Sequence, residues 1–130
     1  MTEKNLKFFV LIFLLLYSLF VQAKFVWINF SQNSVAAFFY DPGSLKKKNH
    51  HRTVWIMANY KNPTRSGELS VTVKQTFDCK RARYKILRLN SYPQKNGKGP
   101  VLTSYPTQKN WKIIIAGTPD SDLMKIMCTK

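Results

Sequence analysis

The sequence predicts an α+β fold, an antiparallel sheet of about five to six strands with a C-terminal helix tethered to it by a disulfide. Short segments rich in aromatic and β-branched residues alternate with turn residues over most of the chain, which is typical of strands. A helical pattern appears only after Gly117. One of the two cysteines, Cys79, ends a segment with the alternating pattern of a strand. The other, Cys128, lies in the helical segment.

The first 23 residues predict a cleavable secretory signal. Lys4 and Lys7 precede an uncharged apolar run over Phe8–Phe20, and Val21-Gln22-Ala23 then offers a signal peptidase site. An uncleaved membrane anchor is the alternative, but 13 apolar residues are fewer than the roughly 20 that span a bilayer. We therefore expect residues 1–23 to be removed.

The remaining residues, 24–130, are expected to form a single domain. A lipoprotein needs a cysteine at its first mature position, and Lys24 stands there. We therefore expect an exported protein, periplasmic or extracellular, without a lipid anchor.

The predicted mature chain is strongly basic. Loss of Lys4, Lys7 and Glu3 with the signal leaves 19 lysines and arginines against 5 acids, a net charge of +14. Such a charge attracts polyanions. Because an exported protein rarely meets intracellular nucleic acid, we expect no nucleic-acid partner. Membrane contact is expected only from the uncleaved precursor or peripherally, and oligomeric state is left open.

The first strands are predicted over Lys24–Phe30 and Val35–Tyr40, joined by a short polar connection. Asp41-Pro42-Gly43-Ser44 predicts a tight turn, because Pro fixes φ and Gly relaxes the next step. Thr53–Tyr60 predicts a third strand, apolar enough to be buried on both faces, and Lys61–Gly67 a loop.

Glu68–Cys79 has the clearest strand pattern, because polar and apolar residues alternate with a period of two. The apolar face comprises Leu69, Val71, Val73, Phe77 and Cys79. Only Gln75 breaks the alternation. Cys79 is therefore expected to point inward.

The partner strand is predicted over Arg83–Tyr92, after a tight basic turn at Lys80-Arg81-Ala82. Pro93–Pro100 predicts a loop with two glycines, Val101–Tyr105 a brief strand, and Trp111–Ile115 the last strand.

The C-terminal helix is predicted to begin at Thr118-Pro119-Asp120, with Thr118 as its cap and Pro119 in its first turn. Leu123, Ile126 and Met127 share one helical face. A helix of about ten residues does not persist alone, so we expect it to depend on the sheet.

Two cysteines in an exported chain most simply form one disulfide, Cys79–Cys128. Closing this loop would contribute about 4 kcal/mol to stability. The alternatives are two free thiols or a two-ligand metal site, although no histidine lies at zinc-finger spacing from either cysteine.

A series of short motifs follows in fixed order along most of the mature chain. They are Phe39-Tyr40-Asp41-Pro42-Gly43-Ser44-Leu45 before a lysine run, Val54-Trp55-Ile56, Asn59-Tyr60-Lys61, Phe77-Asp78-Cys79-Lys80, Arg83-Tyr84, Gly97-Lys98-Gly99, Trp111, Gly117-Thr118-Pro119 and Cys128. This series resembles the surface-adhesin E family of small exported bacterial proteins. The resemblance implies a sheet with a disulfide-tethered C-terminal helix, and binding of host matrix and plasma proteins. The chain departs from the family by lacking a lipid-anchor cysteine.

Catalysis and a cofactor are not expected. Each of the five mature acids has a structural role available, at a turn, a helix start or a strand end, and no nucleophile elbow, phosphate loop or metal-binding helix is present. His50 and His51 could hold a metal or haem iron. A solvated loop is the favoured interpretation, because four cations and no carboxylate lie beside them in sequence.

Three basic clusters are candidate binding surfaces: Lys46–Arg52, Lys80–Lys85 and Lys95–Lys98. Three clusters among so few acids exceed what solubility requires, although solubility alone remains the alternative. The candidate ligand-binding residues are Lys46, Lys47, Lys48, His50, His51, Arg52, Lys80, Arg81 and Arg83.

We therefore hypothesise a non-enzymatic exported binding protein whose basic surface takes anionic glycans or host extracellular-matrix or plasma proteins. The alternative is a periplasmic structural or stress-related envelope protein that contacts anionic lipid or cell-wall polymer. A weaker third hypothesis is haem or metal binding through His50 and His51.

Overall fold

The computed structural model describes residues 2–17 and 24–129. The predicted cleavage site at Val21-Gln22-Ala23 lies outside the described residues. The elements are α1 (Glu3–Tyr17), β1 (Ile28–Gln32), β2 (Ala36–Lys48), β3 (His51–Tyr60), β4 (Ser70–Asp78), β5 (Arg83–Tyr92), the 3₁₀ turn η1 (Lys95–Gly97), β6 (Thr103–Tyr105), β7 (Lys112–Ile113) and α2 (Pro119–Cys128).

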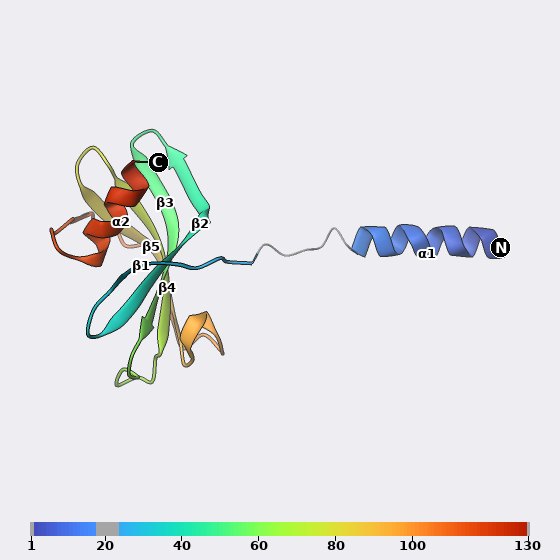
Figure 1. The fold of residues 1–130 in the computed structure, drawn as a ribbon, viewed down its shortest axis with the longest axis horizontal. Helices are drawn as coiled ribbons and strands as arrows, with labels where there is room; N and C mark the ends of the chain where they lie inside the picture. The colour runs from blue at the N-terminus through green and yellow to red at the C-terminus, as the bar shows by residue number, and fades with distance from the viewer. Residues whose placement is uncertain (1, 18–23, 130) are drawn as a thin grey trace.

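Helix α1 contains much of the apolar run, where leucine and phenylalanine without glycine or proline allow a continuous helix. It stands apart from the sheet, and none of its residues is buried (Figure 1). Among the described residues, no helix has the length and apolarity needed to cross a membrane.

The sheet confirms the predicted antiparallel α+β architecture. Its strands run in the order β1-β2-β3-β4-β5-β6, and β7 pairs with the start of β5. From β1 to β6 each strand therefore pairs with its neighbour in sequence, as hairpin connections allow. The sheet curls, and α2 lies across one face of it (Figure 1).

The prediction of a tight turn at Asp41-Pro42-Gly43-Ser44 is wrong. β2 continues through these residues and bulges out of the sheet there. Asp41 pairs with Trp55 and Lys46 with Thr53, so residues 42–45 stand outside the ladder. Asp41 Oδ1 accepts the Gly43 N–H at 2.9 Å, while Ser44 Oγ donates to the Asp41 carbonyl and accepts the Trp55 N–H. The turn-forming side chains thus close a local loop without reversing the chain.

The chain reverses instead at Asn49-His50, where Asn49 adopts a left-handed conformation with φ 54°. Asn tolerates this region better than most residues. Lys47 and Lys48 pair with Arg52 and His51. The segment Lys46–Arg52, expected as a solvated loop, is therefore the tip of a hairpin.

The first and last strands are shorter than predicted. β1 begins at Ile28, opposite Tyr40. The bulge in β2 starts just after Asp41, and residues 24–27 have no ladder partner. β7 contains only Lys112 and Ile113. The expected strands over Arg83–Tyr92 and Val101–Tyr105 are confirmed as β5 and β6, the latter reduced to three residues.

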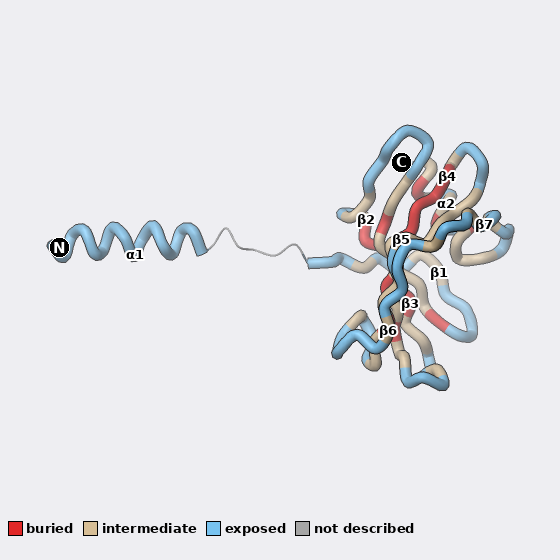
Figure 2. The backbone as a smooth tube through the Cα atoms, turned by 180° about the vertical axis from the view of Figure 1, so that it is seen from behind, coloured by how far each residue is buried: buried red, intermediate tan, exposed pale blue. Residues whose placement is uncertain are grey.

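The core lies between the central strands and α2. Val54 and Phe77 from the sheet and Leu123 and Met127 from the helix are fully buried. The buried segments fall on the middle strands and on α2 (Figure 2). Complete burial of side chains of this size stabilises the fold by about 1.5–3 kcal/mol each, which holds the short helix against the sheet.

The N-terminus of α2 explains why Gln75 breaks the alternation of β4. Thr118 caps the helix by accepting the Ser121 N–H, and Pro119 occupies its first turn, as predicted. Gln75 is buried on the helix-facing side, where Nε2 donates to Asp120 Oδ1 at 2.8 Å. Burial raises the pKa of Asp120, although the Gln75 hydrogen bond and the charge of Lys112 act to lower it.

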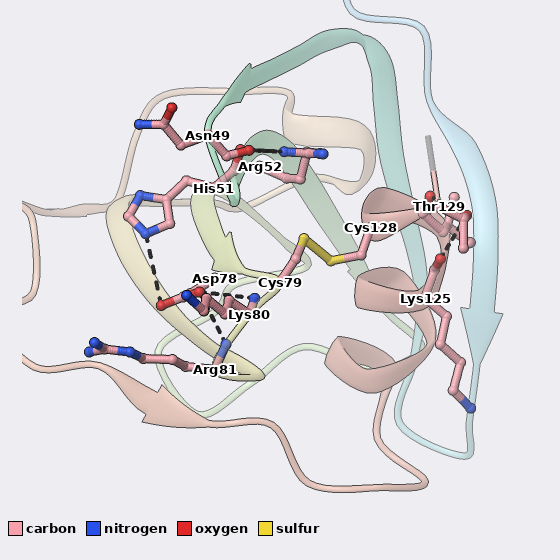
Figure 3. The surroundings of a disulfide bond; sticks show 11 residues. Asn49, His51, Arg52, Asp78, Cys79, Lys80, Arg81, Lys125, Cys128 and Thr129 are labelled. Atoms are coloured by element: carbon pink, nitrogen blue, oxygen red, sulfur yellow. Dashed lines mark hydrogen bonds and ion pairs between the residues drawn. A yellow bond between two sulfur atoms is a disulfide. The ribbon is translucent and has the colours of Figure 1, made fainter.

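A disulfide joins Cys79, just after β4, to Cys128, the last residue of α2 (Figure 3). This confirms the predicted bridge and the expected attachment of the helix to the sheet. The described cysteines leave no free thiol.

Candidate functional site

Two hairpin turns lie side by side at one end of the sheet. His51 at the start of β3 pairs with Asp78 at the end of β4, and the Cys79 N–H donates to the His50 carbonyl at 2.9 Å. The β2–β3 turn at Asn49-His50 therefore adjoins the β4–β5 turn at Lys80-Arg81-Ala82. The two basic segments that contain these turns are brought together by strand pairing.

A surface hollow of about 500 Å³, here called the basic hollow, opens between the two turns. It is lined by Lys48, Asn49, His50, His51, Asp78, Lys80, Arg81 and Arg83. Six of the nine predicted binding residues thus share one hollow, with Asp78 as its single acid.

The other three predicted residues lie elsewhere. Lys46 lines a second groove on the same face of the sheet. Lys47 and Arg52 pair with each other and, by strand alternation, face the opposite side from Lys48 and His51. Arg52 Nη1 donates to the carbonyls of Asn49 and His51 at 2.9 and 3.0 Å, so Arg52 secures the hairpin tip (Figure 3).

Asp78 organises the floor of the basic hollow. Its Oδ1 accepts the backbone N–H groups of Lys80 and Arg81 at 3.1 and 3.2 Å. Its Oδ2 accepts Arg83 Nε at 3.0 Å and lies 3.9 Å from His51 Nε2. Burial by itself raises the pKa of Asp78, but these hydrogen bonds and the Arg83 charge outweigh it, so the pKa is lowered.

Trp111 forms an aromatic wall beside this cluster. The Arg83 guanidinium carbon lies 4.5 Å from the centre of the indole ring, and Lys85 Nζ lies 4.9 Å from it. The His51 ring centre is 5.4 Å from that of Trp111. Cation–π contacts of this kind orient the basic side chains.

Sequence reasoning missed Trp111 and Asp78 as parts of the site, whereas Lys85 belongs to the predicted cluster Lys80–Lys85. Trp111 reaches the hollow because β7 pairs with Arg83 and Tyr84, a long-range contact that residue spacing does not indicate. A tryptophan between Lys109 and Lys112 was the only local signal.

The sheet face that bears the basic hollow, here called the open face, is the one opposite α2. Register and alternation place Lys48, Lys74, Lys85 and Arg88 on it, with Lys74 directly opposite Arg88. Within the described residues, the ion pairs are the two at Asp78. The other cations of this face therefore have no acidic side chain of the described residues within ion-pair distance. Because like charges directly opposite one another destabilise a sheet, the pair Lys74 and Arg88 lowers stability unless an anion binds there.

The haem or metal hypothesis gains no support from neighbouring ligands. Within residues 2–17 and 24–129, no group of three or more His, Cys, Asp or Glu side chains could hold a metal ion. His50 is exposed at the turn, and His51 contacts Asp78 and Trp111.

Comparisons with known proteins agree with the fold. The family model described as surface-adhesin protein E matches residues 27–129. The chain is similar to a solved structure of Haemophilus influenzae protein E, with a TM-score of 0.65, 14% identity, and coverage of 83% of this chain and 87% of that chain. It is also similar to the crystal structure of protein E from non-typeable Haemophilus influenzae, with a TM-score of 0.58 and 17% identity. That match covers 84% of this chain and 79% of that chain. Curated protein sequences contain no match to this chain.

Proposed function

The chain belongs to the surface-adhesin protein E family, and on this basis we propose that it is an exported adhesin that binds anionic partners through the open face and its basic hollow. The partners are acidic segments of host matrix or plasma proteins, or anionic glycans. Removal of residues 1–23 and display outside the cytoplasm are parts of this proposal.

One observation carries the proposal: two separate turns bring six basic residues around one hollow whose only acid, Asp78, is occupied by internal contacts. A ligand carboxylate or sulfate would therefore meet cations that Asp78 does not neutralise. Arg81 is exposed and can form bidentate contacts with either group. Arg83, held by Asp78 and Trp111, presents a preorganised guanidinium.

The test replaces three exposed cations of the hollow, as Lys48→Ser/Lys80→Ser/Arg81→Ser. Binding to heparin and to poly-L-glutamate is measured by surface plasmon resonance at two ionic strengths. We expect affinity to fall about tenfold for the variant, and the parent's affinity to fall steeply with salt.

The matched control is Lys61→Ser/Arg65→Ser/Lys125→Ser, which likewise removes two lysines and one arginine from exposed positions, in the β3–β4 loop and on α2, away from the hollow. It should bind almost as the parent does. Equal losses of affinity in the two variants would mean that binding depends only on the net charge of the protein and not on the basic hollow. That result would refute the proposal. Binding of the parent to anionic vesicles alone would favour the alternative, an envelope protein that contacts lipid.

A further inference from the structure

A second groove of the open face carries aromatic side chains as well as cations. Its volume is about 600 Å³, and it is lined by Lys24, Phe25, Asp41, Lys46, Trp55 and Lys74 among others. A smaller hollow of about 210 Å³ continues from Phe25 and Trp55 towards Trp27, Asn90 and Asn96. Together they form what we call the aromatic groove.

The aromatic cluster is not part of the core. Phe25 stacks on Trp27 with ring centres 5.1 Å apart and meets the edge of Trp55 at 5.7 Å. These rings lie on the face opposite α2, and 51% of the Phe25 surface is exposed. Trp27 and Trp55 are half-buried beside it, and an exposed apolar patch of this kind is a candidate interaction surface.

Polar groups around the rings suit a ligand with hydroxyl groups. Asp41 is almost fully buried in the groove wall, where its Oδ1 accepts the Gly43 N–H. The side-chain oxygens of Asn90 and Asn96 are occupied by Ser104 and Asn59, so their amide N–H groups can donate. Three lysines, Lys24, Lys46 and Lys74, line the groove, and Asp41 is the only acid among the described residues of its lining.

We propose that the aromatic groove binds an acidic glycan of a host surface, with pyranose rings stacked on Phe25, Trp27 and Trp55. The negative face of an aromatic ring attracts the polarised C–H groups of a sugar, and Lys46 and Lys74 meet its sulfate or carboxylate groups. The amide N–H groups of Asn90 and Asn96 beside the rings can donate to sugar hydroxyl and ring oxygens. The inference rests on the proposed function, because it names the ligand class of the same face.

The experiment compares a heparin-derived oligosaccharide with two other anionic probes, poly-L-glutamate and oligo-dT, on the protein lacking residues 1–23 and on Trp27→Ala. Trp27 lies outside every strand, so its replacement spares the ladder. We expect Trp27→Ala to weaken oligosaccharide binding about three- to tenfold and to leave poly-L-glutamate binding unchanged. The melting temperature reports whether the variant keeps its fold.

The matched control is Tyr105→Ala, which removes an exposed aromatic ring from β6, outside the groove. It should bind all three probes as the parent does. Unchanged oligosaccharide binding by Trp27→Ala, or an equal loss for poly-L-glutamate, would overturn the inference. A larger loss for oligo-dT would assign the groove to nucleic acid instead.

The two proposals fail separately. If the parent binds poly-L-glutamate through the basic hollow and Trp27→Ala changes nothing, only the glycan inference falls. If the parent binds neither heparin nor poly-L-glutamate, both fall.

Discussion

At the scale of single residues, Asp78 determines how the basic hollow is built. Its buried carboxylate holds Arg83 from β5 and the backbone of the Lys80-Arg81 turn, and it lies near His51 from β3. A buried charge is tolerated only when it is paired and hydrogen-bonded. The single acid of the basic hollow thus fixes the positions of the Arg83 side chain and of the Lys80-Arg81 backbone.

Replacement of Asp78 by Asn should destabilise the protein and change its response to acid. At neutral pH we expect the free energy of unfolding to fall by about 1–3 kcal/mol, because charge-assisted contacts are lost and buried donors lose their acceptor. Since folding lowers the pKa of Asp78 from its ordinary value of 3.8, its stabilisation is present above that value and is lost as pH falls through the folded-state pKa.

The difference between parent and Asp78→Asn should therefore shrink as pH falls from 7 to below 3.8. Urea unfolding followed at several pH values measures it. Asp120, whose raised pKa acts in the opposite direction, is present in both proteins and cancels. The exposed acid Asp122 supplies the control, since Asp122→Asn should leave the pH dependence intact. Parallel pH profiles for parent and Asp78→Asn would contradict this role.

At the scale of elements, local pattern predicted the strands well and the turn at Asp41-Pro42-Gly43-Ser44 badly. β5 and α2 agree with their expected bounds because period and capping residues are local signals. The same local chemistry, an Asp side chain accepting the Gly43 N–H, closes a turn and a bulge alike. Whether the chain reverses depends on the resumed pairing of Lys46 with Thr53, which no local pattern contains.

The candidate site follows the same division. Its basic residues were predictable because clustered charge is visible in sequence, and six of them share the hollow. Arg52 was expected to bind ligand, but strand alternation turns it towards the hairpin backbone. Trp111 could not be found, because its place depends on the pairing of two-residue β7 with β5.

The disulfide should be the main attachment of α2 beyond its apolar face. Cys128→Ser is expected to cost up to about 4 kcal/mol in the free energy of unfolding, because the unfolded chain regains the entropy of an open loop. Thermal unfolding with and without reductant measures the effect. Reductant should lower the melting temperature of the parent and leave that of the variant unchanged. An unchanged parent would exclude a stabilising role for the bond.

At the scale of the whole molecule, charge and apolar surface are divided between the two faces of one sheet. α2 covers one face with a dry core around Phe77 and Leu123. The open face keeps its cations and an exposed aromatic cluster. The sheet thus has its buried core on one side and the proposed binding surface on the other.

Cleavage of the predicted signal determines whether the exported protein carries residues 1–23 in addition to the open face. We expect the exported protein to begin at Lys24, because the apolar run and the Val21-Gln22-Ala23 site precede it. Intact mass spectrometry should give the mass of residues 24–130 less two hydrogens for the disulfide. Purification of the same chain from reducing cytosol provides the comparison without the bond. Recovery of the full precursor from the membrane fraction would contradict cleavage.

The position of the disulfide also governs how the molecule responds to mechanical tension. Cys79 and Cys128 enclose residues 80–127, which include Lys80, Arg81 and Arg83 of the basic hollow. When the chain is pulled at its two ends, the force passes through the disulfide from Cys79 to Cys128 and not through residues 80–127. β4 lies between two ladders, so it yields only when its pairing with β3 and β5 is broken. Shear at a cell surface would therefore extend the N-terminal strands while the enclosed cations remain unstretched.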